Sequence, residues 1–152
     1  LNFGQANFSH GSEFTTFPID SIYFSNIICY ESSHPSVARG FINNGARFLT
    51  IQANDAWLQN SSGVRQHFEL ARLRAIEFRT GIIRSANTGI SGIIDPTGLI
   101  KHKVNFSDQE VFQGDVLLNN GLTFYASFGS LFAQLCFVLI LFQGVFILIR
   151  RK

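Results

Sequence analysis

The first informative feature of this chain is what it lacks. It contains no methionine and only two cysteines among 152 residues. Because a complete translated chain begins with methionine, we expect a chain that starts at Leu1 to be a processed product or the C-terminal piece of a longer protein. Cys29 lies in the polar part of the chain and Cys136 in an apolar C-terminal run, so their backbones should not approach closely enough for a disulfide. Two free thiols leave the redox compartment undecided.

Charged residues are also scarce. They make up 14% of the sequence, and the net charge at pH 7 is only +2. A nucleic-acid-binding protein needs a basic stripe that neutralises phosphates, so this balance excludes that class. The histidines show no spacing typical of metal ligands, and Lys101-His102-Lys103 fits a solvated strand edge. We therefore expect no nucleic acid, no metal and no cofactor.

Apolar residues, by contrast, gather in one long segment. Residues 131–149 contain no charge, and as a helix they would extend ~28 Å, close to the ~30 Å of a bilayer's hydrocarbon core. The three basic residues Arg150, Arg151 and Lys152 follow at once, and such a cluster marks the cytoplasmic end of a membrane helix. A buried core helix is the alternative. The predicted division is a domain over 1–120, a juxtamembrane linker over 121–130, a transmembrane helix over 131–149 and a cytoplasmic basic tail over 150–152.

The part of the chain before residue 120 alternates strand and helix patterns. Alternating apolar residues between turn residues predict strands, and apolar residues at helical spacing, with Pro near a start or Gly past an end, predict helices. Strands separated by helices indicate an α/β domain in which helices cover a buried sheet. The expected strands are 21–30, 48–53, 81–86, 90–94, 99–104 and 110–118, the expected helices are 35–44 and 66–79, and 60–63 is an expected loop.

Cys29 is the candidate reactive residue. It follows Ile27-Ile28 at the end of the first expected strand, and Glu31 lies two residues further on. A thiol at the end of a buried strand beside an acid is typical of a positioned nucleophile. Free cysteines are more often small core residues, and on these residues alone that second interpretation is favoured.

Several segments, in order, resemble the nitrilase (carbon–nitrogen hydrolase) superfamily. Residues 27–31, Ile-Ile-Cys-Tyr-Glu, resemble its nucleophile strand, and Asn54-Asp55-Ala56-Trp57 resembles the motif that follows the next strand. The resemblance implies the C-terminal part of a nitrilase-type α/β/β/α sandwich, an α/β fold, followed by one transmembrane helix. Residues 121–126, just before that helix, are similar to the apolipoprotein N-acyltransferase branch rather than to soluble amidases. Further segments that resemble the superfamily are 66–77, 84–90 and 94–98.

This resemblance implies acyl transfer through a cysteine. In the family a thiolate takes an acyl chain from a phospholipid, and the N-terminal amine of a diacylglyceryl-cysteine lipoprotein takes it from the thioester. By matching motifs, Cys29 is the nucleophile, Tyr30 offers its backbone N–H to the oxyanion, and Glu31 supports the site geometry. A free thiol, with a pKa of about 8.5, needs a base and a cation to ionise readily.

The rest of the family's catalytic triad is not found in this chain. The family's glutamate base and lysine lie upstream of the nucleophile, and residues 1–28 contain no lysine and only Glu13, which lies in a loop. We therefore expect Cys29 to be the one triad member present and this chain alone to be inactive. Asn54 and Trp57 either shape the substrate pocket or serve for capping and packing, and His67 is expected to be a structural helix residue.

The resemblance also implies a location and partners. It favours a transferase of the bacterial inner membrane whose domain lies on the periplasmic side. A phospholipid would be the acyl donor and an apolipoprotein the acceptor. Two alternatives stay open: a membrane-tethered amidase of the same superfamily, and a truncated, non-catalytic membrane protein.

Overall fold

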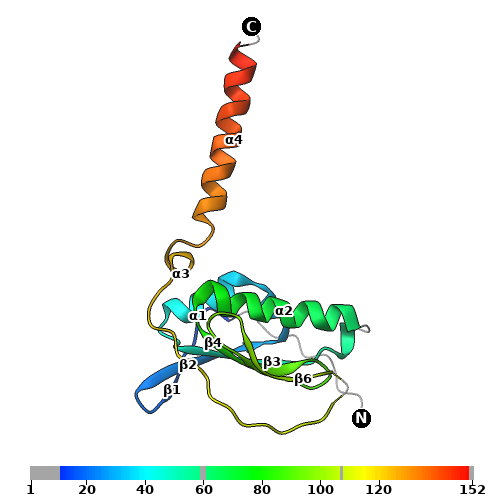
Figure 1. Ribbon diagram of the computed structural model, residues 1–152. Helices are drawn as coiled ribbons and strands as arrows, with labels where there is room; N and C mark the ends of the chain where they lie inside the picture. Colours follow the sequence, from blue (N-terminus) through cyan, green and yellow to red (C-terminus); the bar gives the residue numbers. More distant parts are fainter. Residues whose placement is uncertain (1–10, 59–60, 107, 151–152) are drawn as a thin grey trace.

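A six-stranded mixed sheet organises the domain (Figure 1). The computed structural model describes residues 11–58, 61–106 and 108–150. The strands follow one another in sequence order across the sheet. The second to fourth strands are parallel and the other pairs antiparallel. The strands are β1 (Phe17–Ile19), β2 (Ile22–Ile28), β3 (Phe48–Ala53), β4 (Gly81–Ala86), β5 (Ser91–Ile94) and β6 (Ile100–Val104).

Two helices connect the parallel strands and cover one face of the sheet (Figure 1). The first, α1 (Pro35–Asn43), has its proline in the first turn and is followed by Gly45, whose φ of +99° suits glycine. The second, α2 (Ser61–Phe78), presents an apolar stripe toward the sheet. The core between helices and sheet is formed mainly by Ile27, Leu49, Ile51, Phe68, Ala71, Ala75, Phe78, Ile82 and Ile94.

Most predicted element positions are confirmed. The bounds of β3 and β4 match the prediction, and α1, β5 and β6 differ from it by one residue at an end. The first expected strand is shorter than predicted, because β2 ends at Ile28 and Cys29 already belongs to a 3₁₀ turn. The loop expected over 60–63 is wrong from Ser61 onward, where α2 begins, and Asn60 lies outside the described residues.

The strand predicted over 110–118 is wrong. This segment has no regular structure and crosses the face of the sheet opposite the helices (Figure 1). The Phe112 ring stacks on His102 with centroids 4.3 Å apart, and the Leu117 carbonyl accepts a hydrogen bond of 2.9 Å from Gly81 N–H at the start of β4. The segment thus contacts the sheet through an aromatic stack and a backbone hydrogen bond to β4, with the side chains of Val111 and Leu117 exposed, and it lacks the repeated backbone pairs of a ladder strand.

The segment predicted as a juxtamembrane linker contains a short helix, α3 (Phe124–Phe128), that is attached to the domain. Thr123 Oγ1 donates to the Glu77 carbonyl at 2.7 Å, and Arg39 Nε donates to the Ala126 carbonyl at 2.7 Å. The Tyr125 ring lies against Phe78, with centroids 5.6 Å apart. These contacts tie α3 to both covering helices.

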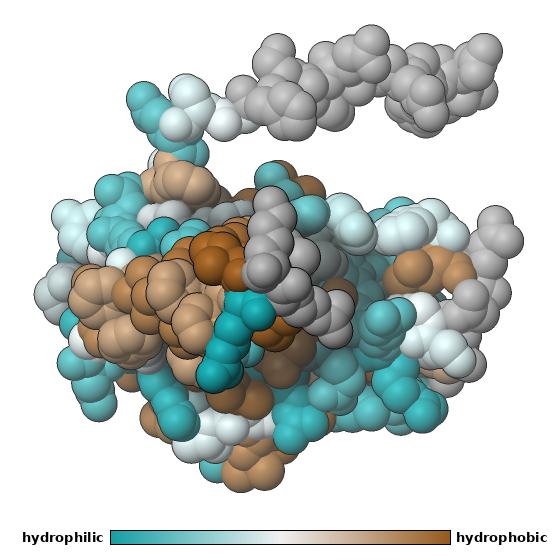
Figure 2. Space-filling model, turned by 90° about the horizontal axis from the view of Figure 1, so that it is seen from above, coloured by the Kyte–Doolittle hydropathy of each residue, from teal (hydrophilic) through white to brown (hydrophobic). Residues whose placement is uncertain are grey.

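The last helix, α4 (Leu131–Arg150), stands away from the domain (Figure 1). Its apolar side chains are largely exposed, with Phe132 at 75%, and Figure 2, which looks down on this end of the molecule, shows hydrophobic surface gathered there. By length and apolarity together, no helix within the described part of the chain qualifies as a membrane span. The predicted span over 131–149 is therefore not confirmed, and Arg151 and Lys152 lie outside the described residues.

Candidate functional site

Cys29 lies in a sharp turn where the chain leaves the sheet. It follows β2 directly and begins a 3₁₀ turn, η1 (Cys29–Ser33), with a φ of +48°. This left-handed conformation is unfavourable for a residue with a Cβ, by roughly 1–2 kcal/mol. Nearby hydrogen bonds hold the turn closed. The Ile28 N–H donates to Glu31 Oε2 at 2.9 Å, and the Ser32 hydroxyl donates to the Cys29 carbonyl at 2.7 Å.

The thiol faces the end of the neighbouring strand. Cys29 Sγ lies 3.8 Å from the Asn54 carbonyl, just beyond β3. The Asn54 side chain is itself held, because its Oδ1 accepts hydrogen bonds from the Thr88 hydroxyl at 2.9 Å and from Ala56 N–H at 3.3 Å. Since β2, β3 and β4 are parallel, the loops after them meet at one edge of the sheet. Open α/β sheets place their ligand sites at this edge.

An aromatic pocket is lined in part by the 3₁₀ turn that begins at Cys29. Tyr30 and Trp57 are 57% and 54% exposed, and their rings lie edge to face with centroids 6.2 Å apart. Both rings line a pocket of about 210 Å³, together with His67 from α2. The structure thus brings Tyr30 and Trp57 together at one pocket, whose lining does not include Cys29, and the Glu31 carboxylate accepts its hydrogen bond from Ile28 N–H.

A buried charged cluster lies beneath this turn. Asp55 Oδ1 is 2.7 Å from His67 Nδ1, and Asp55 Oδ2 accepts a hydrogen bond of 2.8 Å from Arg84 Nη2. His67 Nε2 lies 3.1 Å from the Cys29 carbonyl and 3.0 Å from the Ser32 hydroxyl. The three ionisable residues are at most 5% exposed. We call Asp55, His67 and Arg84 the buried triad.

The charges of the buried triad stabilise one another. Burial by itself raises the pKa of Asp55, but the hydrogen bond from His67 and the charge of Arg84 outweigh burial, and the pKa is lowered. Burial lowers the pKa of Arg84, and the charges of Asp55 and Cys29 oppose that shift. Asp55 is therefore an anion at neutral pH, enclosed by its two partners.

The sequence indicated only part of this cluster. Asp55 stood in a motif and His67 was expected to be structural, but Arg84 and Ser32 were not singled out as site residues. Arg84 does carry a signal, because a charged residue inside the apolar strand β4 is buried only when it is paired. Its partner could not be named from the chain, since Asp55 lies 29 residues away.

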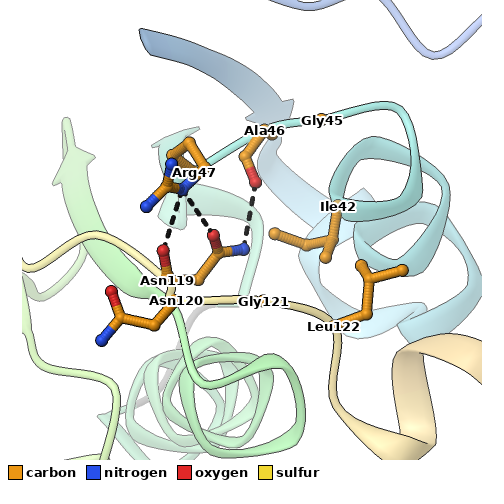
Figure 3. A pocket seen from close by; sticks show the side chains of 8 residues that line it. All are labelled: Ile42, Gly45, Ala46, Arg47, Asn119, Asn120, Gly121 and Leu122. Atoms are coloured by element: carbon orange, nitrogen blue, oxygen red, sulfur yellow. Dashed lines mark hydrogen bonds between the residues drawn. The ribbon is translucent and has the colours of Figure 1, made fainter.

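A second pocket, of about 270 Å³, lies at the turn between α1 and β3 (Figure 3). There Arg47 Nε donates to both the carbonyl and the side-chain oxygen of Asn119, at 2.8 and 2.9 Å, and Asn119 donates to the Ala46 carbonyl at 3.2 Å. These contacts fasten the chain before α3 to the domain. Neither Cys29 nor the buried triad lines this pocket. Among the described residues, no group of three His, Cys, Asp or Glu side chains is placed to hold a metal ion.

Comparison with known proteins identifies the family to which this sequence is similar. Residues 6–120 match the carbon–nitrogen hydrolase family. A protein of Geobacter metallireducens named apolipoprotein N-acyltransferase is 34% identical over 133 residues, covering 88% of this chain and 26% of that protein. One of the same name from Chlorobaculum tepidum is 36% identical over 138 residues, covering 88% and 26%. The chain thus spans about a quarter of the length of these curated relatives.

Solved structures agree in fold. Saccharomyces cerevisiae Nit3, a member of branch 10 of the nitrilase superfamily, superposes with a TM-score of 0.56 at 23% identity, covering 64% of this chain and 38% of that one. A mutant Nesterenkonia amidase of the nitrilase superfamily gives a TM-score of 0.51 at 15% identity, covering 60% and 37%. These likenesses show a nitrilase-type α/β fold.

The left-handed backbone at Cys29 can be tested by stability. Replacing Cys29 with glycine should leave a protein more stable than replacing it with alanine, by about 1 kcal/mol, because glycine adopts this conformation without a Cβ clash. Denaturant unfolding of the two variants measures the difference. Gln52, exposed within β3 and without a positive φ, provides the control. There glycine should be the less stable of the two, and the same order at both positions would contradict the assigned conformation.

The buried ion pair can be tested by a double-mutant cycle. Asp55→Asn and Arg84→Met should each destabilise the protein by about 3–5 kcal/mol, because each leaves a buried charge unpaired. The double variant should cost clearly less than the sum. Additive losses would show that the pair contributes no coupling.

The same variants predict a pH dependence. Because folding lowers the pKa of Asp55 below its ordinary 3.8, its contribution to stability is present above that pH and is lost as the pH falls through the folded pKa. Unfolding free energies measured from about pH 6 to about pH 2, across the range in which Asp55 becomes protonated, should therefore fall less steeply for the double variant than for the wild type.

Proposed function

Because this chain belongs to the carbon–nitrogen hydrolase family, we propose that it is the C-terminal part of an N-acyltransferase whose nucleophile is Cys29. The observation that supports this most directly is the position of the thiol. It lies at the carboxyl edge of three parallel strands, on a turn held closed by Glu31 and Ser32, beside an aromatic pocket. The relatives named apolipoprotein N-acyltransferase support the choice of reaction.

In the first proposed step the Cys29 thiolate attacks an ester carbonyl of a phospholipid. A carbon–sulfur bond forms, the ester carbon–oxygen bond breaks, and the lysophospholipid alcohol leaves with a proton. The oxyanion that develops needs donors fixed in place, and the backbone N–H of Tyr30, directly after Cys29, is our candidate. Glu31 holds the turn through Ile28 and is thereby suited to a supporting role.

In the second proposed step the N-terminal amine of a diacylglyceryl-cysteine lipoprotein attacks the thioester. A carbon–nitrogen bond forms, the carbon–sulfur bond breaks, and the thiol is regenerated after the amine loses a proton. A base must take that proton and a cation must stabilise the intermediate. Residues 1–28 contain no lysine, so we propose that the rest of the protein supplies both groups.

The surroundings of the thiol favour a lipid substrate over a small amide. Tyr30 and Trp57 present exposed rings next to Cys29, and such amphipathic aromatic side chains are typical of sites at a lipid interface. Asn54 and Trp57 are our candidates for shaping the pocket. A membrane-tethered amidase would use the same thiol with water as acceptor, and it is the second candidate because the nitrilase-type fold is shared with amidases.

We further propose that α4 attaches this domain to the bacterial inner membrane, with the domain on the periplasmic side. Its apolar side chains are exposed along its length, among them Phe132, Ile140 and Phe142, and a continuous exposed apolar surface of this kind marks an interaction or membrane site. The basic residues at its end, Arg150, Arg151 and Lys152, are typical of a cytoplasmic boundary. This placement would hold Cys29 near phospholipid donors.

The nucleophile can be tested in the complete protein. Incubation with a phospholipid that carries a labelled acyl chain should label Cys29 through a bond that hydroxylamine cleaves, and mass spectrometry of peptides locates the label. Cys29→Ala should abolish labelling, whereas Cys136→Ala should retain it, because Cys136 lies in α4 away from the site. A hydroxylamine-stable label, or a label on another residue, would contradict the proposal. The 152-residue chain alone should not transfer acyl groups.

Membrane attachment predicts a fractionation result. The chain should remain in the membrane fraction after alkaline carbonate extraction, and a version that ends at Ser130 should be released. A version in which Leu139 and Phe142 of α4 are replaced by lysine provides a control of unchanged length. It should also be released, since charges within an apolar membrane helix cost about 2.5–3.5 kcal/mol each. Retention of the version ending at Ser130 would show that α4 is not the attachment.

A further inference from the structure

We infer that His67 is a positioning residue for Cys29, an inference that rests on the proposed role of Cys29 as nucleophile. The imidazole joins the backbone of Cys29 to the buried Asp55–Arg84 pair. Its Nε2 lies 3.1 Å from the Cys29 carbonyl oxygen, and its Nδ1 lies 2.7 Å from Asp55 Oδ1. No other ring in the described residues has recorded hydrogen-bond contacts to both the Cys29 backbone and a buried carboxylate.

The neighbours of the ring determine its role as donor and acceptor. At Nδ1 the ring faces the Asp55 carboxylate, which can only accept, at 2.7 Å, and Arg84 Nη2 lies 3.1 Å from the same nitrogen. The Cys29 carbonyl can also only accept, so a hydrogen bond to it requires that Nε2 carries a hydrogen and donates. His67 Nε2 faces the Cys29 carbonyl and, at 3.0 Å, the Ser32 hydroxyl. Ser32 in turn donates to the same Cys29 carbonyl at 2.7 Å. The ring, the hydroxyl and the carbonyl therefore contact one another pairwise, and the side chains of Ser32 and His67 are both buried.

These contacts act on a backbone that needs support. Cys29 is held at a φ of +48°, which a residue with a Cβ adopts only when its surroundings require it. If the carbonyl were released, the peptide would relax toward an ordinary conformation and the thiol would move with it. A misplacement of about 1 Å at a reacting group can cost ~10²-fold in rate. A contact to the Cys29 carbonyl therefore affects the direction of the thiol.

The loop after β3 holds Cys29 at two points. The Asn54 carbonyl lies 3.8 Å from the thiol, and the next residue, Asp55, holds the Cys29 carbonyl through His67. Asp55 itself is immobilised by Arg84, which donates from Nη2 to Asp55 and from Nε to the Ile90 carbonyl at 3.1 Å. A Cβ at Gly89 would collide with the Asp55 carboxylate, so the turn after β4 closes against it. Through His67 and Asp55, the backbone of Cys29 is thus connected to Arg84 in β4, a central strand of the sheet.

Two substitutions of His67 separate this role from a packing role. His67→Gln keeps a donor near the place of Nε2 and loses the contact to Asp55, whereas His67→Asn keeps a donor near the place of Nδ1 and loses the contact to Cys29. If His67 positions Cys29, His67→Gln should retain the greater reactivity at Cys29. If His67 serves only to satisfy Asp55, His67→Asn should be equal or better.

The experiment uses the complete protein in detergent, with Cys136→Ala as the common background. The first measurement is the rate at which iodoacetamide alkylates Cys29, which needs no substrate. The second is the kcat and KM of acyl transfer from phospholipid. We expect His67→Asn to lower the alkylation rate and kcat by about tenfold or more, with KM little changed, and His67→Gln to recover most of that loss. Rates are expressed per folded molecule, with the folded fraction taken from thermal unfolding.

The outcomes distinguish the inference from the function on which it rests. Equal rates for the two variants, or a faster His67→Asn, would overturn the positioning role. If the wild type transfers no acyl chain but alkylation still follows the expected order, the proposed function fails and the positioning role stands. If both variants lose stability equally yet alkylate at the wild-type rate per folded molecule, His67 is structural only and the inference is wrong.

Discussion

The ion pair between Arg84 and Asp55 is the interaction on which the site depends. Both side chains are essentially inaccessible to water, and a buried guanidinium without a carboxylate would cost several kcal/mol, on the order of 3–5. The loop after β3 must therefore place the Asp55 carboxylate within hydrogen-bond distance of Arg84. The pair also requires a glycine at position 89, since any Cβ there would occupy the place of the carboxylate.

From this pair the constraint extends to the reactive residue. Asp55 orients His67, and His67 contacts the carbonyl of Cys29. Asn54, carried by the same loop, faces the thiol. The turn at Cys29 is unfavourable by itself, and it persists because Ser32, Glu31 and His67 each hold one of its atoms. A conformation that is poor locally is thus maintained by contacts from its own 3₁₀ turn and from α2, which is typical of residues at functional sites.

The proposed reaction divides its chemistry between this site and the rest of the protein. This chain offers a thiol, a candidate oxyanion donor at Tyr30 and an aromatic pocket. The base and the cation are proposed to come from the rest of the protein. If the other catalytic groups come from the rest of the protein, this domain must keep a fixed orientation, and the attachment of α3 contributes to that. Thr123 and Arg39 tie the chain between domain and α4 to the helices that cover the sheet. A domain fastened in this way would keep a constant orientation toward the lipid surface proposed for α4.

The sequence by itself determined the elements whose signals are local. Short apolar runs between turn residues located β3 and β4, and Pro35 and Gly45 delimited α1. The order of the motifs along the chain then indicated the family, and the first of these motifs singled out Cys29. The tertiary structure decided what depends on distant partners. The segment over 110–118 carries a strand-like pattern, but it forms no strand: its Phe112 ring stacks on His102 of β6, while Val111 and Leu117 are exposed. Arg84 needed a carboxylate, and only the parallel pairing of β3 with β4 brings Asp55 to it. Backbone preference and hydrophobic period act over a few neighbouring residues, whereas burial and charge pairing are settled by which strands lie side by side.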